Sequence, residues 1–143
     1  MTSDRVARTR GFSLIELLIV VVLASIIMAL GIPSYREYAM RANRADATSA
    51  LLRIGTAQER FFLDEDTYTT DLADVGFGTG KTERDFYNLD IQAAAGGIAA
   101  GYTVTATAAA GQGQDRDTEC LELSLNESGR RGSDPGDPDL CWR

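Results

Sequence analysis

The chain has 143 residues and a formal net charge of −7, so it has room for one modest domain with an acidic surface. An acidic body argues against proteins that bind nucleic acid through its phosphates, because such binding needs clustered basic side chains. The sequence contains no histidine, the commonest general base and transition-metal ligand, and no nucleotide-binding loop or paired nucleophile and base, so we expect neither an enzyme nor a cofactor.

The N-terminus combines a short basic segment with a long apolar one. Residues 1–11 are polar and include Arg5, Arg8 and Arg10, and the apolar residues 12–32 follow directly. A helix of about 21 residues is roughly 31 Å long, which matches the hydrocarbon thickness of a bilayer. The basic flank predicts that the N-terminus stays in the cytoplasm. A secretory signal would have its cleavage site after the apolar run, so we expect a single-pass membrane segment instead.

Glu16 is the strongly polar residue of this apolar run. A carboxylate at membrane depth costs about 2.5–3.5 kcal/mol, so a cationic partner is expected. If the chain were cut before Phe12, the new α-amine would be the nearest suitable cation, but within one chain it lies a full helical turn away along the same axis. The pairing therefore fits the amine of a neighbouring subunit and predicts a polymer. The alternative is an ordinary signal anchor in which Glu16 is incidental.

The sequence Arg10-Gly11-Phe12-Ser13-Leu14-Ile15-Glu16, with the apolar residues that follow, resembles the cleavage and methylation motif of type IV pilins and type II secretion pseudopilins. The resemblance implies cleavage between Gly11 and Phe12 by an inner-membrane prepilin peptidase. It also implies N-methylation of Phe12, and pairing of Glu16 with the Phe12 amine of an adjacent subunit. It further implies a precursor anchored in the bacterial inner membrane, which an assembly platform adds to an extracellular pilus. Residues 1–11 would be the leader peptide.

Pro33 ends the apolar run, and we expect a kink or a melted turn there. Proline cannot donate the backbone hydrogen bond that would reach the carbonyl of Ala29, and Gly31 weakens the same turn. The resemblance implies the same loss of helicity and makes Pro33 an assembly residue together with Phe12 and Glu16. The alternative is that Pro33 simply ends the membrane helix. Residues 12–33 are thus the predicted transmembrane and polymerisation segment.

Residues 34–63 continue the helix as an amphipathic half. Apolar residues recur at three- and four-residue spacing and form one stripe that needs a cover: Ala47, Ala50, Leu51, Ile54, Ala57 and Phe61. The charged residues fall largely off the stripe, so we expect them to face solvent or other subunits: Arg36, Arg41, Arg44, Arg53, Glu59 and Arg60. Just beyond the membrane, Tyr35 and Tyr38 predict either interfacial anchors or contacts with neighbouring helices.

Residues 64–143 are predicted to form a globular head. The acidic residues 64–66 suit a solvated helix end, and the Gly-rich segment to residue 85 suits an irregular connection with a short helical turn at 70–75. Three runs alternate with period two and predict half-buried strands: Tyr87, Leu89 and Ile91; Tyr102, Val104 and Ala106; Leu121, Leu123 and Leu125. Residues 108–118 read as an exposed loop, 126–129 as a turn, and 130–133 as a short edge strand.

An antiparallel sheet with one apolar face and a helix with one apolar stripe complete each other's core. The predicted fold class is therefore α+β, with a long N-terminal helix packed against a small antiparallel β-sheet. The resemblance implies the same fold, because type IV pilin heads wrap an antiparallel sheet against the C-terminal half of the long helix.

The two cysteines, Cys120 and Cys141, lie near the C-terminus. A chain whose head is exported can keep them as a disulfide, and a loop of about 22 residues closed in this way stabilises the fold by roughly 3 kcal/mol. Strand alternation places Cys120 on the face opposite Leu121 and Leu123, so its sulfur should point away from the helix. The alternative is two free thiols. By resemblance, residues 120–141 match the pilin disulfide loop, a surface associated with assembly and receptor contacts.

Three aspartates in this loop, Asp134, Asp137 and Asp139, alternate with glycine and proline. Carboxylate oxygens on a tight loop are ligands that Ca²⁺ prefers. The spacing is not that of an EF-hand, and acidic residues are ordinary in turns, so we expect no metal and keep calcium as the alternative.

Three further stretches resemble PilE-like minor pilins, which help to initiate pilus assembly: residues 35–38, 57–62 and 141–143. We therefore predict a minor pilin, a structural subunit of a type IV pilus that supports pilus biogenesis, adhesion and twitching motility. The expected partners are the membrane, other pilin subunits, the prepilin peptidase and the assembly platform.

Three alternatives stay open: a major pilin, a type II secretion pseudopilin, and a DNA-uptake or adhesin pilin. The paired cysteines count against a pseudopilin. For DNA uptake the only support in the head is Arg130 and Arg131, two basic residues in an acidic setting. Nucleic acid is therefore not an expected partner.

Overall fold

The computed structural model describes residues 12–143, so the leader and the Gly11 side of the predicted cleavage site lie outside the described residues. The chain divides into two compact units, Met1–Glu37 and Tyr38–Arg143. One helix, α1 (Leu14–Glu65), contributes to both units and has 52 residues. We call the second unit, Tyr38–Arg143, the globular unit.

Helix α1 is unbroken across Pro33, so the predicted melted turn is absent from this structure. One proline removes a single i to i−4 hydrogen bond, and the flanking turns keep theirs. Hydroxyl groups in this half of the helix bond back to carbonyls of the preceding turn: Ser25 Oγ donates to the Val22 carbonyl over 2.8 Å, and Ser34 Oγ to the Leu30 carbonyl over 3.5 Å. Such bonds satisfy the hydroxyls without a partner outside the helix.

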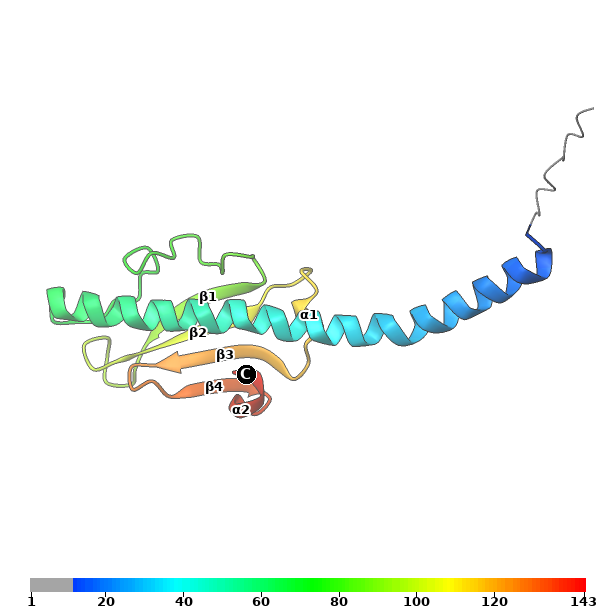
Figure 1. Cartoon of the computed structure of the whole chain (residues 1–143). Coiled ribbons are helices and arrows are strands. Elements are labelled where there is room, and N and C mark those ends of the chain that lie inside the picture. The colour runs from blue at the N-terminus through cyan, green and yellow to red at the C-terminus, as the bar shows by residue number, and fades with distance from the viewer. Residues whose placement is uncertain (1–11) are drawn as a thin grey trace, which may run out of the picture. The chain divides into compact units, whose positions relative to one another are not determined.

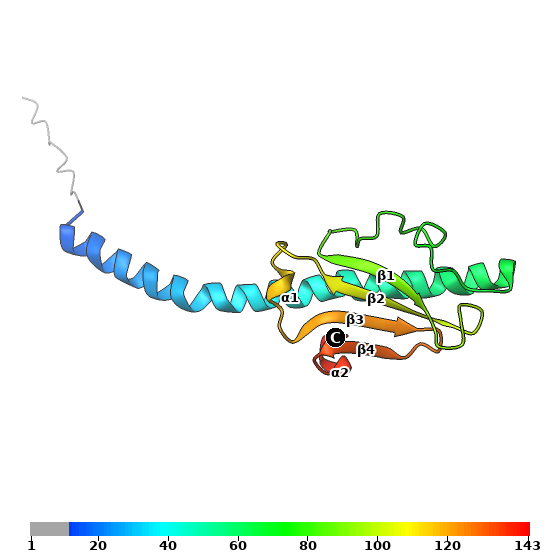
Figure 2. The same cartoon turned by 180° about the vertical axis from the view of Figure 1, so that it is seen from behind.

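The globular unit holds a four-stranded antiparallel sheet in the order β1-β2-β3-β4 (Figure 1). The strands are β1 (Tyr87–Ala93), β2 (Tyr102–Ala108), β3 (Cys120–Asn126) and β4 (Arg131–Pro135). The second half of α1 runs along one face of this sheet, as the front and back views together show (Figures 1 and 2). The 3₁₀ turn η1 (Gln114–Arg116) precedes β3, and the short helix α2 (Pro138–Cys141) follows β4. The predicted α+β fold and its strands are confirmed.

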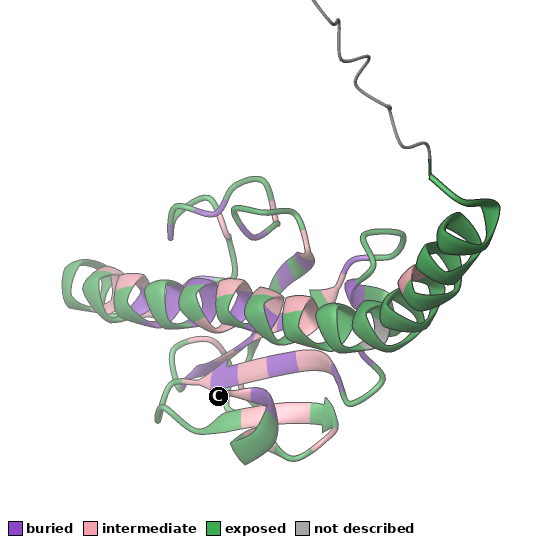
Figure 3. Ribbon diagram, turned by 45° about the vertical axis from the view of Figure 1, so that its right-hand side comes forward, coloured by how far each residue is buried: buried purple, intermediate pink, exposed green. Residues whose placement is uncertain are grey.

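The core forms where the predicted apolar stripe of α1 meets the inward positions of the strands. Ala47, Ala50, Leu51 and Ile54 are buried, and a purple band marks this face of the helix in Figure 3. In the sheet, register places Leu89 opposite Ala106 and Val104 opposite Leu125, so inward side chains meet across the strands. The buried cluster also includes Val75, Phe77, Tyr87, Ile91, Tyr102 and Leu123.

The predicted orientation of Cys120 is wrong because β3 contains a β-bulge. Cys120 pairs with Pro135 and Glu122 pairs with Asp134, although Cys120 and Glu122 are two positions apart and Pro135 and Asp134 only one. Leu121 is therefore one extra residue in β3. The extra residue reverses the alternation. Cys120 is therefore fully buried on the same side as Leu123, while Leu121 is only half-buried.

The segment that joins α1 to β1 is held by one buried polar side chain and by backbone turns. Gln58, fully buried on α1, donates from Nε2 to the Thr69 carbonyl over 2.6 Å, and its Oε1 accepts from the Thr69 N–H over 3.0 Å. These two hydrogen bonds fix the chain where it turns back along α1. The turn follows the exposed acidic end of the helix and includes Asp66, which has a left-handed φ of 55°. The segment 72–77 forms turns closed by backbone bonds such as Phe77 N–H to the Leu72 carbonyl, rather than the predicted helical turn at 70–75.

Candidate functional site

The N-terminal candidate site lies at the start of α1. Phe12 precedes the helix and its side chain is 85% exposed. Glu16 lies in the first turn of α1, where unpaired backbone N–H groups and the helix dipole favour a negative charge. The side chain of Glu16 is exposed, so a group outside this chain can reach it. Gly11, the other half of the predicted cleavage site, falls outside the described residues.

The helix that follows is long and apolar enough to cross a membrane, and the apolar window is not buried within the molecule. Its large side chains are exposed on every side of the helix rather than along one stripe, for example Ile15, Leu18, Ile27 and Leu30. A helix that is apolar all round is covered either by lipid or by other helices.

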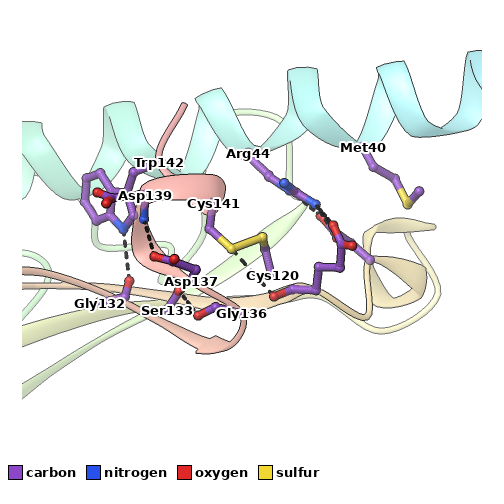
Figure 4. The surroundings of a disulfide bond; sticks show 12 residues. Met40, Arg44, Cys120, Gly132, Ser133, Gly136, Asp137, Asp139, Cys141 and Trp142 are labelled. Atoms are coloured by element: carbon purple, nitrogen blue, oxygen red, sulfur yellow. Dashed lines mark hydrogen bonds and ion pairs between the residues drawn. A yellow bond between two sulfur atoms is a disulfide. The ribbon is translucent and has the colours of Figure 1, made fainter.

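The second candidate site is the C-terminal lobe, which we define as β4 and α2. Cys120 and Cys141 form a disulfide with a Cα–Cα distance of 5.7 Å, and both residues are fully buried (Figure 4). The disulfide joins β3 to α2 and fixes the chain end against the sheet. Trp142 Nε1 donates to the Gly132 carbonyl over 2.9 Å, and the Arg131 guanidinium lies 5.0 Å from the centre of the Trp142 ring.

The three aspartates of this lobe do not converge. Asp134 lies in β4 opposite Glu122, whereas Asp137 caps α2 by accepting the Asp139 N–H over 2.9 Å. Among residues 12–143, no group of three or more His, Cys, Asp or Glu side chains is placed to hold a metal ion. The structure therefore does not bring Asp134, Asp137 and Asp139 together as one ligand set, and Asp137 serves instead as the cap of α2.

A buried ion pair joins α1 to the segment before β3. Arg44 donates from Nε to Asp117 Oδ2 and from Nη2 to Asp117 Oδ1, each over 2.7 Å. The side chains of Arg44 and Asp117 are 7% and 3% exposed, and the exposed Glu119 lies 3.6 Å from Nη2. The hydrogen bonds that Arg44 donates to Asp117 raise the pKa of Arg44, and this effect outweighs the lowering by burial.

Gln114 completes this polar cluster. Its Nε2 donates to Asp117 Oδ2 over 2.9 Å and to the Met40 carbonyl over 3.3 Å. The hydroxyl of Tyr87 is buried nearby, and burial raises its pKa well above the ordinary value. The prediction that Arg44 faces solvent, and that residues 108–118 form an exposed loop, is therefore wrong at Arg44, Gln114 and Asp117. Helical spacing could have predicted the burial of Arg44, because this residue shares one helix face with the buried Ala47, Leu51 and Ile54.

Comparison with known proteins identifies the family. A family model described as "Type IV minor pilin ComP, DNA uptake sequence receptor" matches residues 33–124, well over half of the chain. The chain belongs to the type IV pilins. A second model, for the prokaryotic N-terminal methylation motif, matches residues 6–32, which contain the predicted motif around Phe12 and Glu16.

Several curated pilins are similar to the chain. The type IV major pilin PilA of Myxococcus xanthus is 37% identical over 89 residues, which are 62% of this chain and 40% of PilA. The major pilin PilE of Neisseria gonorrhoeae is 25% identical over 91 residues, covering 64% and 54%, and a fimbrial protein of Pseudomonas aeruginosa is 32% identical over 87 residues, covering 52% and 56%. The chain thus spans about half the length of the curated relatives it matches.

Among solved structures, a type IV pilin from Shewanella oneidensis is similar, with a TM-score of 0.49 and 20% identity over 73% of this chain and 98% of that one.

Proposed function

We propose that this pilin is a filament subunit whose precursor is cleaved between Gly11 and Phe12 and whose α1 then packs among the helices of other subunits. The observation that carries the proposal is the exposure of apolar side chains all round the first half of α1. Before assembly lipid would cover these side chains, and after assembly neighbouring helices would. The same surface therefore serves as an anchor and as an assembly contact.

The charge of Glu16 favours transfer of the subunit from the membrane into the filament. In lipid its carboxylate costs about 2.5–3.5 kcal/mol unless a cation neutralises it. Cleavage before Phe12 would create an α-amine of the required charge, which a neighbouring subunit can place beside Glu16. The transfer from membrane to filament would then remove an unpaired charge from lipid, and it favours subunits in a fixed axial register.

The precursor needs two partners in this scheme besides other subunits. A prepilin peptidase removes residues 1–11 and leaves the Phe12 amine, which is then N-methylated. An inner-membrane assembly platform adds the subunit to the growing pilus. The basic residues of the leader favour a cytoplasmic N-terminus before cleavage. The role is structural, and no catalytic step by this chain enters it.

Whether the subunit is minor or major depends on its copy number. The family model that matches carries the description of a minor pilin, which favours the predicted minor role. The matched relatives PilA and PilE carry the description of major pilins. Quantitative mass spectrometry of sheared filaments gives the ratio of this chain to other pilins. A ratio well below one supports the minor role, and a dominant share of this chain overturns it.

The assembly role is tested by replacing Glu16 in the full chain and following the variants into sheared filaments. Glu16→Ala should still be inserted and cleaved, because the motif before Phe12 is intact, but it should be absent from filaments. Ser25→Ala is the matched control within the same apolar helix, since the Ser25 hydroxyl bonds to the Val22 carbonyl of its own helix. Incorporation of Glu16→Ala at the wild-type level would contradict the proposed role of Glu16.

A second candidate function is DNA uptake, which the description of the matched family model favours. The globular unit has a hollow of about 200 Å³ that Arg130 and Arg131 line together with Thr103, Ser124, Asn126 and Gly132. Two phosphate contacts would be few for stable binding, and the acidic surface opposes them.

The test measures binding of the full chain in detergent to duplex DNA at several salt concentrations. If Arg130 and Arg131 contact phosphates, their joint replacement by alanine should lower the salt slope of log K by about 2. No binding at low salt would exclude this function for the isolated subunit.

A further inference from the structure

Another hollow of the globular unit brings carboxylates together around a buried tyrosine. It has a volume of about 270 Å³ and lies between the later turns of α1 and the turn that joins β3 to β4. These elements meet at the same end of the unit, as the front and back views together show (Figures 1 and 2). We call this hollow the acidic pocket, and its lining includes Leu52, Gly55, Glu59, Tyr102, Leu125 and Glu127.

The hydroxyl of Tyr102 reaches the acidic pocket without a hydrogen-bond partner. The residue is 2% exposed and lines the pocket, and its hydroxyl forms no hydrogen bond within the described chain, residues 12–143. The oxygen lies beside Gly55, where an added Cβ would be 3.5 Å from Tyr102 Oη and 3.2 Å from Leu125 Cδ2. Glycine is unfavourable inside a helix, and here it leaves the floor of the pocket open. Buried hydroxyl groups normally have a partner, so a polar group from outside the chain is expected at this position.

Two carboxylates lie close to this hydroxyl. The backbone N–H of Glu127 donates to the Tyr102 carbonyl over 3.3 Å, and its side chain packs so closely on Gly101 that a Cβ there would come 2.8 Å from Glu127 Cδ. The hydroxyl of Tyr68 donates to Glu59 Oε1 over 3.4 Å, and the Tyr68 ring contacts the Tyr102 ring with 4.9 Å between the ring centres. Among the residues described, neither Glu59 nor Glu127 forms an ion pair, so their charges are not neutralised by this chain.

The electrostatic potential in the pocket is negative. Burial raises the pKa of Tyr102 to about 12, with help from the charges of Glu59 and Glu127, and the same two charges add to the effect of burial in raising the pKa of Tyr68. The lining also contains Arg131, whose guanidinium lies 5.0 Å from the centre of the Trp142 ring and forms no ion pair with either carboxylate. The pocket therefore favours a cation from solution.

We propose that the acidic pocket binds a small aliphatic amine as its ammonium ion. An ammonium group has three N–H donors, and the pocket offers three acceptor groups, the carboxylates of Glu59 and Glu127 and the hydroxyl oxygen of Tyr102. The aliphatic stem of the amine lies on the apolar floor that Leu52 and Leu125 form. Because a volume of about 270 Å³ is small for a ligand site, the pocket suits a short, unbranched amine. The inference does not rest on the proposed filament role.

The first experiment is a titration of the full chain in detergent, at neutral pH, with butylamine. Backbone amide signals are followed by nuclear magnetic resonance. The signals of Gly55, Glu127 and Gly129 should shift and saturate in the millimolar range, because exposed charge pairs are weak. Butan-1-ol has the same stem without the charge, and sodium chloride matches the ionic strength, so neither should give saturable shifts there. Saturation by either control, or no saturation by butylamine, overturns the proposal.

The second experiment measures butylamine affinity in variants of the three acceptors. Glu59→Gln and Glu127→Gln should each weaken binding by about two- to five-fold, and the double variant by about ten-fold. Tyr102→Phe should also weaken binding, because it removes the hydroxyl and keeps the ring. Glu65→Gln is the matched control, since it neutralises an exposed carboxylate of the same helix outside the pocket. An equal loss of affinity in Glu65→Gln would mean that the acidic surface attracts amines in general, and it overturns the site.

Folding is checked by urea unfolding of each variant, followed by the fluorescence of Trp142. A Tyr102→Phe variant that folds as the wild type does and binds butylamine with unchanged affinity overturns the role of the hydroxyl. If Tyr102→Phe does not fold, the variants of the exposed Glu59 and Glu127 decide the outcome. Loss of this site would leave the proposed filament role intact, because the role of Glu16 is tested in a different segment and by a different assay.

Discussion

Replacing Arg44 by methionine removes one half of a buried ion pair and leaves the Asp117 carboxylate inside the globular unit. Asp117 loses two hydrogen bonds of 2.7 Å and keeps one bond of 2.9 Å, from Gln114 Nε2. Breaking a buried pair by removing one partner costs about 3–5 kcal/mol, because the remaining charge is uncompensated. A domain of this size is stable by about 5–15 kcal/mol, so the variant should lose a large part of its stability.

The assay is urea unfolding of the full chain in detergent, followed by the fluorescence of Trp142, the chain's single tryptophan. Urea is preferred to guanidinium because it does not screen charges. The matched control is Arg53→Met on the same helix, which breaks the ion pair with Glu83. Those two side chains are 57% and 70% exposed, and exposed pairs contribute less than about 1 kcal/mol.

A double-mutant cycle tests the physical reason. Arg44→Met with Asp117→Leu removes both charges, so it should cost less than the sum of the two single changes by about 1–3 kcal/mol. Two results would contradict a strongly coupled buried pair: an Arg44→Met variant no less stable than Arg53→Met, or a cycle in which the two single costs simply add. Either would mean that the pair is solvated rather than buried.

Three further predictions concern the globular unit and use the same unfolding assay. Joint replacement of Cys120 and Cys141 by serine should cost roughly 3 kcal/mol, since the unfolded chain gains the entropy of an open loop, and an unchanged midpoint would contradict this. Gly136→Ala should destabilise by about 1–3 kcal/mol, because its Cβ would overlap the backbone carbonyl oxygen of Glu119 and the chain must shift; a stability equal to wild type would contradict the close approach. Burial, helped by the nearby Glu59, raises the pKa of Tyr102 to about 12. The folded state therefore keeps this phenol neutral while the unfolded state ionises near pH 10, so its contribution to stability should be complete below about pH 10 and fall as the pH rises toward 12. Tyr102→Phe should remove this contribution and make the alkaline fall shallower, while the part due to the buried Tyr87 remains; an unchanged pH profile would contradict the shift.

The regular elements could be predicted because their periodicity is local. Apolar residues at three- and four-residue spacing defined the buried face of α1, and period-two alternation defined the first two strands. The N-terminal motif is also local, since its charge, apolar run and Glu16 lie within one short stretch. These features need no knowledge of which distant residues meet.

The errors came from contacts between distant residues. Arg44 and Asp117 are 73 positions apart, so nothing near either residue shows that it will be paired and buried. Cys120 was assigned to the wrong face because a single extra residue in β3 reverses the alternation, and strand patterns do not reveal a bulge. Spacing alone likewise does not show that Asp137 is used as a helix cap.

In the proposed function the chain is processed before Phe12 and works as a filament subunit. The most direct test is the intact mass and N-terminal sequence of the protein recovered from sheared filaments. The proposal predicts a chain that begins at N-methylated Phe12 and carries the intact Cys120–Cys141 disulfide. A chain that keeps residues 1–11 and stays in the membrane fraction would make it a plain membrane anchor and would contradict the claim.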